Sequence, residues 1–375
     1  MIDLMESRRK IDEIDQQMVQ LFEQRMEIAK DVADYKRAVG KKVFDKEREE
    51  DKLNQLEKLV SDNFNVHCIR ELFTQIMSMS RKLQYSMLES YQEDMIFEQI
   101  EKINVTKDTK VVYFGTDGSY SQQAMEEYFG CELESFASNT FQGVMEAIKK
   151  GEAEFGVLPI ENTSTGGITD IYDLLAQYDH YIIGEQVIKV DHALLGLEGA
   201  TIEGLRKVYS HPQGIKQCNK FLKEYPDMKS IESDSTAGSA KKVCEEMDIT
   251  QGAIASVKAA SRYGLTILKE CINYEDSNST RFIIIGKERI FLQKSNKVSI
   301  CFVLPHESGT LYNMLSHIIF NNLNMTKIES RPLSGKKFEY RFFVDFEGNL
   351  TMPAVKNALN GIFEEAIELK ILGNY

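Results

Sequence analysis

Residues 4–38 read LMESRRKIDEIDQQMVQLFEQRMEIAKDVADYKRA, a stretch without proline or glycine. Its apolar residues recur at three- and four-residue intervals, which is typical of one helix face; they are Ile11, Ile14, Met18, Leu21, Phe22, Ile28, Ala29 and Val32. The stretch therefore predicts one helix of about 35 residues, roughly 50 Å long. A single helix of this length with one apolar stripe needs partners to be stable.

Two cations, Arg25 and Lys36, fall inside this apolar stripe. They are eleven residues apart, which is three helical turns, so both side chains point the same way. A cation on a buried face is costly unless an anion neutralises it. Two interpretations remain open at this point: side chains that snorkel over a coiled-coil seam, or a site for an anionic ligand.

Further helices follow this stretch. Gly40 ends the first helix, and helical patterns continue over about 45–60 and 66–88. Three helices in about 90 residues make a thin core, so we expect an intertwined dimer in which the long helix crosses into a second subunit. Residues 89–108 are charged and are compatible with a linker helix.

The rest of the chain changes pattern. From 109 to 288, short apolar runs alternate with amphipathic stretches, which predicts an α/β segment of two small lobes with a cleft between them. Residues 295–375 follow the order β-α-β-β-α-β, which is that of a ferredoxin-like α+β domain. We therefore expect three domains, at residues 1–92, 109–288 and 295–375.

Composition narrows the class of protein. The 375 residues are 42% hydrophobic and carry a formal net charge of -13, which argues against nucleic acid and anionic membranes as partners. Six scattered cysteines contain no CxxC pair, so neither a disulfide framework nor a metal site is indicated. The N-terminus is too polar for a signal peptide and no run of about 18 apolar residues occurs, so a cytoplasmic location is expected.

Polar and charged residues gather around the two cations of the first helix. Taken singly they are ordinary surface charges and i,i+4 pairs. In their order along the chain they resemble the small all-helical chorismate mutases; the matching residues are Arg8, Arg25, Lys36, Asp45, Arg48, Glu49, Ser80 and Gln84. Arg8 lies 17 residues before Arg25, about 100° round the helix, so it cannot share that direction within one chain. It is expected to enter a neighbouring subunit's pocket.

The resemblance implies a pericyclic rearrangement of chorismate to prephenate that needs neither a covalent catalyst nor a cofactor. Arg25, with Arg8 of a second subunit, would clamp the dicarboxylate. Lys36 and Gln84 would donate to the breaking ether oxygen. The remaining substrate contacts would be Glu49 and Asp45 at the ring hydroxyl, Arg48 at a carboxylate, and Ser80.

Three polar motifs precede helices in the middle segment, at residues 161–167, 210–213 and 234–237. Each is explained as an ordinary N-cap, but helix starts around one cleft also offer N–H groups to anions. Over 109–288 these motifs resemble prephenate dehydratase, together with Gly115–Ser121, Leu158–Thr163 and Thr280–Phe282. The chain departs from that pattern at Thr116-Asp117, where the family usually has Pro-Lys, so one substrate contact is in doubt.

This resemblance implies that prephenate loses carbon dioxide and hydroxide to give phenylpyruvate. Thr280 would donate the proton to the departing hydroxyl, with Glu161, Asn162 or Gln213 in support. His211 is an alternative acid/base, or a structural residue at a helix start. The further substrate-binding residues implied are Asn162, Thr163, Gln213, Ser235, Thr236, Arg281 and Phe282.

Two motifs of the last segment, Ser308–Tyr312 and Glu329–Pro332, resemble those of the phenylalanine-binding ACT regulatory domain. Thr310 stands where that family normally has Ala. The resemblance implies L-phenylalanine as an allosteric ligand, held by Gly309, Thr310, Leu311, Glu329, Ser330 and Arg331.

Together the three segments resemble the bifunctional chorismate mutase–prephenate dehydratases with a C-terminal ACT domain. This implies a homodimeric or larger enzyme of phenylalanine biosynthesis under feedback control. Two alternatives stay open: a two-lobed solute-binding or sensor protein, and a chain with one active and one vestigial domain.

Overall fold

The computed structural model describes residues 3–87, 96–274 and 277–375. The chain divides into two compact units. The first contains Met1–Ile96 and Ile300–Lys370, and the second contains Phe97–Ser299 and Ile371–Tyr375. Among the described residues, no helix is both long and apolar enough to cross a membrane.

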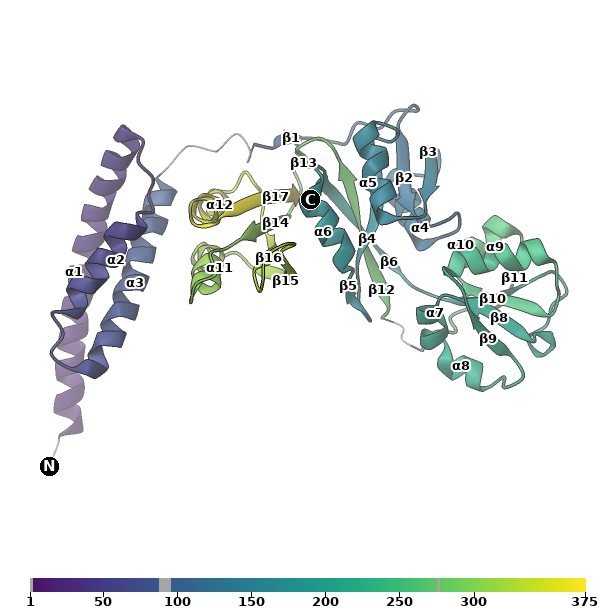
Figure 1. The fold of residues 1–375 in the computed structure, drawn as a ribbon, viewed down its shortest axis with the longest axis horizontal. Coiled ribbons are helices and arrows are strands. Elements are labelled where there is room, and N and C mark those ends of the chain that lie inside the picture. Colours follow the sequence, from purple (N-terminus) through teal and green to yellow (C-terminus); the bar gives the residue numbers. More distant parts are fainter. Residues whose placement is uncertain (1–2, 88–95, 275–276) are drawn as a thin grey trace. The chain divides into compact units, whose positions relative to one another are not determined.

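The first unit begins with three helices (Figure 1), which are α1 (Leu4–Val39), α2 (Lys46–Glu57) and α3 (Asn63–Ser86). The Asp3 carboxylate caps α1 by accepting from the Met5 N–H at 2.9 Å, and Gly40 ends the helix with φ 65°. The predicted long helix is confirmed. The third helix begins earlier than expected because Asp62 caps it, and Leu88, its expected last residue, lies outside the described residues.

The apolar stripe of α1 is left largely uncovered by its own chain. Ile11 and Ile14 are each 55% exposed, Leu21 is 64% exposed, and Ile28 is 63% exposed. Single exposed apolar residues are ordinary, but a repeated stripe along one helix marks a surface that another element covers.

The first unit also holds most of four adjacent strands and two helices. These strands have the order β15-β16-β14-β17 and form one end of a larger sheet. The elements, in chain order, are β14 (Lys297–Val303), α11 (Thr310–Phe320), β15 (Met325–Pro332), β16 (Tyr340–Glu347), α12 (Pro353–Glu365) and β17 (Glu368–Asn374). The start of β14 and the end of β17 belong to the second unit.

The second unit has two lobes, each with its own sheet, as expected for the middle segment. The sheet of the first lobe has the order β6-β12-β4-β2-β3, with β5 beside β4. Its elements are β2 (Lys110–Phe114), α4 (Tyr120–Phe129), β3 (Glu134–Ser138), α5 (Phe141–Lys150), β4 (Phe155–Asn162), β5 (Gly166–Gly167), α6 (Thr169–Gln177), β6 (Tyr181–Lys189) and β12 (Ser279–Gly286).

The sheet of the second lobe has the order β11-β7-β10-β8-β9. The chain enters this lobe after β6 and returns into β12, and these two paired strands run side by side in Figure 1. The elements of the second lobe are β7 (Ala193–Gly196), a 3₁₀ turn (Ile202–Gly204), β8 (Lys207–Ser210), α7 (Pro212–Gln217), α8 (Asn219–Lys223), β9 (Lys229–Glu232), α9 (Thr236–Glu246), β10 (Gln251–Ala255), α10 (Val257–Tyr263) and β11 (Thr266–Lys269).

The linker helix expected over 89–108 is wrong for its described part. Glu98–Ile100 form strand β1, which pairs in parallel with β13 (Ile290–Leu292). Ile100 and Ile103 pack against the core of the first lobe, so burial of these side chains outweighs the helical tendency of the charged sequence. Residues 88–95 lie outside the described residues.

Candidate functional site

The three N-terminal helices enclose a cavity of about 710 Å³. Seven of the residues singled out in the first segment line it together. α1 supplies two cations, the start of α2 supplies three charged side chains, and α3 supplies two polar ones; these are Arg25, Lys36, Asp45, Arg48, Glu49, Ser80 and Gln84. The cations of α1 are therefore not snorkelling over a seam but face a polar cavity.

Contacts between the helices hold these side chains in place. The Arg25 guanidinium donates to the Ser80 hydroxyl, and Lys36 Nζ donates to the Val43 carbonyl at 2.5 Å. The Asp45 carboxylate caps α2 by accepting from the Arg48 N–H at 3.2 Å. The buried Oε1 atom of Gln84 has no hydrogen-bond partner within the described part of the chain, so this amide oxygen can accept a hydrogen bond from a ligand.

The cavity combines both signs of charge. Burial lowers the pKa of Arg25, against the opposing charge of Glu49. Burial and, next, the positive charge of Arg48 lower the pKa of Lys36, while nearby carboxylates act in the opposite direction. Five cations and four carboxylates line the cavity, and this mixture suits a ligand that carries carboxylates at one side and a hydroxyl at the other.

Arg8 does not line this cavity; it lies exposed near the start of α1. Arg81, by contrast, lines the cavity although it belongs to none of the motifs found in the sequence. It is buried and pairs with Glu49. The sequence contains a signal for Arg81, because Met77 and Tyr85 lie four residues before and after it on the buried face of α3. Arg81 is thus a cation within an apolar stripe, as Arg25 is in α1.

A second cavity, of about 890 Å³, lies between the two lobes of the second unit. Seven residues singled out in the middle segment line it, namely Asn162, His211, Gln213, Ser235, Thr236, Thr280 and Phe282. β4 ends at Asn162, and β12 carries Thr280 directly opposite it in the antiparallel register. The pairing of these two strands therefore brings residues 118 positions apart into one site.

The Thr280 hydroxyl is the best-supported reactive group of this cavity. Asn162 Nδ2 donates to Thr280 Oγ1 at 2.9 Å and to Asn278 Oδ1 at 2.9 Å. The side-chain Oδ1 of Asn162 in turn accepts from the Ser164 hydroxyl at 2.7 Å. Because Thr280 Oγ1 accepts this bond, its own proton remains available to a ligand in the cavity.

Three helices begin at the cavity. Ser119 caps α4, His211 caps α7 and Ser235 caps α9, each by accepting a backbone N–H with its side chain. The cap interpretation of the sequence motifs is thus confirmed for His211 and Ser235. The first-turn residues of these helices also line the cavity, so their positive ends border it. Helix N-termini favour carboxylates.

Three expected residues are not brought into this cavity. Glu161 and Arg281 pair with each other at 3.1 Å. They alternate with Asn162 and Thr280 along their strands, so they lie on the other face of the sheet. The Thr163 hydroxyl is exposed and accepts from the Ser279 N–H at 2.9 Å, which anchors the start of β12.

The departure at Thr116-Asp117 also has a structural outcome. Asp117 pairs with Arg262 of α10 and accepts from the Tyr113 hydroxyl at 2.7 Å, and these bonds hold its pKa below the usual value. It does not line the cavity, whereas Thr116 does, with a buried hydroxyl.

His192 also lines the cavity between the lobes. Its Nε2 atom lies 2.9 Å from Gln217 Oε1, and burial lowers the pKa of the His192 imidazole. No pattern in the sequence singled out His192.

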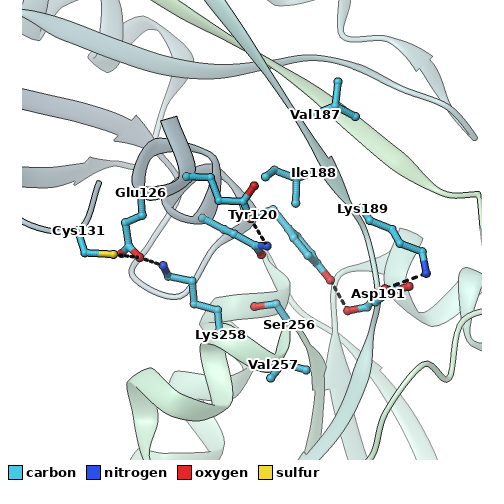
Figure 2. A pocket seen from close by; sticks show the side chains of 12 residues that line it. Tyr120, Glu126, Cys131, Val187, Ile188, Lys189, Asp191, Ser256, Val257 and Lys258 are labelled. Carbon is cyan, nitrogen blue, oxygen red and sulfur yellow. Dashed lines mark hydrogen bonds and ion pairs between the residues drawn. The ribbon is translucent and has the colours of Figure 1, made fainter. Parts of the chain in front are cut away.

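A third cavity, of about 700 Å³, contains none of the expected site residues. Tyr120 borders both this cavity and the one between the lobes. Figure 2 shows Lys258 of α10 pointing toward Glu126 of α4, with Cys131 beside the carboxylate. The ion pair of Lys258 and Glu126 joins the two lobes. Lys189 and Asp191 also pair with each other, so every charged side chain that Figure 2 labels has a partner.

The two motifs of the last segment lie on different elements. Gly309, with φ 80°, precedes α11, and a Cβ there would meet no atom within 4 Å. Thr310 Oγ1 donates to the Pro305 carbonyl at 3.1 Å, and Leu311 follows it in the first turn. The second motif falls in β15, where Glu329, Ser330 and Arg331 are paired with β16.

Comparisons with known proteins agree with this division of the chain. The chorismate mutase type II family model matches residues 7–85, and the prephenate dehydratase family model matches residues 111–290. The bifunctional chorismate mutase/prephenate dehydratase of Escherichia coli K12 is 31% identical over 378 residues, which cover 99% of this chain and 96% of that protein.

Solved structures are similar over 71% of the chain. The prephenate dehydratase of Arthrobacter aurescens in complex with L-Phe has a TM-score of 0.67 and 26% identity, with 89% of its chain covered. A protein described as GqqA, a novel type of quorum quenching acylase, has a TM-score of 0.66 and 29% identity, with 97% of its chain covered. Since the relative from E. coli matches over nearly its full length, the chain belongs to the bifunctional chorismate mutase/prephenate dehydratase family and carries both enzymatic activities.

Proposed function

We propose that the cavity of the three helices is the chorismate mutase site and that the cavity between the lobes is the prephenate dehydratase site. The observation that carries the proposal is the meeting of seven expected polar side chains in the first cavity and of Thr280 with Asn162 in the second. The proposed domains span residues 1–92, 109–288 and 295–375.

In the first site, the rearrangement of chorismate makes and breaks bonds only within the substrate. Catalysis therefore consists of holding the compact conformer and stabilising charge as it develops. Arg25 and Arg48 bind carboxylates, and Asp45 and Glu49 hold the ring hydroxyl. Lys36 and Gln84 donate to the ether oxygen as its bond breaks, and Ser80 holds the Arg25 guanidinium.

In the second site, prephenate loses carbon dioxide while its ring hydroxyl leaves as water, which forms phenylpyruvate. The electrons of the broken carboxylate bond enter the ring, and Thr280 donates the proton that the hydroxyl needs. Asn162 stabilises the negative charge that grows on Thr280 Oγ1. Since Glu161 pairs with Arg281 outside the cavity, Asn162 replaces it as the supporting group.

The substrate carboxylates of this site meet helix N-termini. Ser235 and Thr236 begin α9, and Gln213 lies in the first turn of α7. These backbone N–H groups compensate for a cation missing at Thr116-Asp117.

The last segment is proposed as a ferredoxin-like ACT domain that binds L-phenylalanine and inhibits the enzyme by feedback. The strand order β15-β16-β14-β17 with two helices supports the fold, and the relative from Arthrobacter aurescens is described in complex with L-Phe.

The exposed stripe of α1 supports a dimer in which α1 of one subunit covers α1 of the other. This arrangement would bring Arg8 of one subunit to the cavity of the other. We also propose, from the sequence, that the protein is located in the cytoplasm.

The first prediction concerns Lys36. Lys36→Ala removes a donor to the transition state and should lower the kcat for chorismate by about 10²- to 10³-fold. Dehydratase activity on added prephenate should persist because that cavity belongs to the other compact unit. Lys41→Ala, at an exposed position nearby, serves as the control. Chorismate turnover within about threefold of wild type would refute the role of Lys36.

The second prediction concerns Thr280. Thr280→Ala should abolish phenylpyruvate formation, while Thr280→Ser should retain part of it because the hydroxyl remains. Both variants should still form prephenate from chorismate. Thr266→Ala, at an exposed position of β11, controls for the loss of a strand threonine. If the alanine variant dehydrates prephenate normally, the proton comes from another group, and His211 becomes the candidate.

The third prediction concerns the shared site. Inactive Arg8→Ala and Arg25→Ala subunits, when mixed and allowed to exchange, should regain mutase activity, because each heterodimer contains one cavity with both arginines. The measurement is chorismate turnover before and after exchange, with exchange itself followed by differently labelled subunits. Complete exchange without recovery would mean that Arg8 serves no neighbouring cavity.

The fourth prediction concerns phenylalanine. Micromolar to millimolar L-phenylalanine should raise the melting temperature by mass action and lower dehydratase activity. Gly309→Val should weaken this binding, because φ 80° strains any residue with a Cβ. Gly335→Val is the matched control, since Gly335 has φ 78° and equally open surroundings. Equal loss of binding in both variants, or tighter binding of another amino acid, would contradict the assignment.

A further inference from the structure

Two adjacent carboxylates at the end of α12, Glu364 and Glu365, contact the helices that form the mutase cavity. Both residues belong to the first compact unit, together with α1, α2 and α3. The Glu364 side chain accepts from the Val43 N–H at 3.3 Å and from the Phe44 N–H at 2.9 Å. Glu365 Oε1 accepts from Arg81 Nε at 2.9 Å. Neither carboxylate lines the cavity itself.

Glu364 acts on the segment that holds Lys36. The peptide N–H groups of Val43 and Phe44 point to Glu364, and the Val43 carbonyl accepts from Lys36 Nζ at 2.5 Å. Val43 is buried, so its N–H would lack a partner if the carboxylate were removed. The position of the Lys36 ammonium therefore depends on a residue more than 300 positions later in the chain.

Glu365 acts on Glu49 through Arg81. The Arg81 side chain is 6% exposed and bridges Glu49, which lines the cavity, and Glu365, which is 9% exposed. Burial disfavours the charged guanidinium, but the charges of Glu365 and Glu49 outweigh that cost and raise the pKa of Arg81. The two carboxylates share the single positive charge of Arg81. The contact of Arg81 with Glu365 therefore limits how closely Arg81 can bind Glu49.

The same contacts reach the helix that follows the proposed phenylalanine site. α11 begins directly after Gly309 and carries Ser316 and His317. Ser316 Oγ accepts from Lys82 Nζ of α3 at 2.8 Å, and His317 Nε2 lies 3.1 Å from Glu365 Oε1. A displacement of α11 would therefore be transmitted to Glu365, Arg81 and Glu49 through direct contacts.

We propose that Glu364 and Glu365 are positioning residues for the rearrangement of chorismate, and that phenylalanine regulates the mutase through Glu365. Glu364 sets Lys36, and Glu365 sets Glu49. The inference rests on the proposed placement of the mutase site and of the phenylalanine site. It gives the C-terminal segment two roles, since this segment would position residues of the mutase site and would also regulate the dehydratase.

The two carboxylates should be distinguishable by kinetics. Lys36 acts mainly in the transition state, so Glu364→Gln should lower the mutase kcat about tenfold with little change in KM. Glu49 holds the ring hydroxyl in substrate and transition state alike, so Glu365→Gln should raise KM about tenfold with a smaller change in kcat. Effects of this size fit a displacement well under 1 Å, because a full 1 Å can cost about 10²-fold.

The experiment uses the full chain and measures chorismate turnover, prephenate dehydration and melting temperature for each variant. Glu368→Gln is the control, because Glu368 lies three residues beyond Glu365 in an exposed pair with Arg341. Dehydration of added prephenate should stay within about twofold of wild type in all three variants. Saturating L-phenylalanine should inhibit the wild-type mutase severalfold and inhibit Glu365→Gln less.

If the glutamine variants lose their fold, Glu364→Asp and Glu365→Asp keep the charge but withdraw it by one methylene, and the same split between kcat and KM is expected at smaller size. Mutase constants within about twofold of wild type in folded Glu364 and Glu365 variants would overturn the inference. An equal loss in both constants, matched by a loss of dehydration, would mean a general structural role and would overturn it too. Wild-type protein without chorismate turnover would instead refute the proposed function.

Discussion

Arg81 is a full positive charge buried among helices, and its neutralisation constrains the whole N-terminal unit. A guanidinium cannot be moved away from water unless carboxylates accompany it. Glu49 of α2 and Glu365 of α12 both meet this requirement, so α2, α3 and α12 are fixed around one cation. The polar cavity lies beside Arg81, and Arg25 and Lys36 of α1 face Arg48 and Glu49 of α2 across it.

Strand register plays the corresponding part in the second unit. Thr280 and Asn162 face the cavity because they are opposite each other on β12 and β4. Their neighbours Arg281 and Glu161 face away for the same reason, and they pair with each other instead. A shift of one residue in either strand would exchange the two pairs. The two proposed sites are therefore set by different constraints, charge burial in one and pleat alternation in the other.

The sequence predicted those parts of the molecule that leave a strong local pattern. The stripe of α1 and the alternation of helices and strands in the middle segment are of this kind. Edge strands such as β3 (Glu134–Ser138) and β9 (Lys229–Glu232) were not predicted, because an edge strand is only partly buried and shows no apolar run. Face assignments also failed for Glu161 and Arg281, since a motif places residues in order but does not say which side of a sheet each one faces.

Some residues could be found only in three dimensions. The partners of Arg81 come from helices separated by most of the chain length, and His192 reaches its cavity from the segment that connects the lobes. The contact between Glu364 and the backbone of Val43 leaves no trace in either local sequence.

The pairing of residues 371–375 has a consequence for the order in which the two units can fold. Residues 371–375 belong to the second unit, where the Tyr375 backbone exchanges hydrogen bonds with Lys297 and its hydroxyl lies 2.8 Å from Ser299. The sheet of the dehydratase unit therefore includes residues 371–375, which follow the whole of residues 300–370 in the chain. It can be completed only after that intervening segment has been synthesised, whereas the three N-terminal helices are neighbours in sequence and can pair earlier.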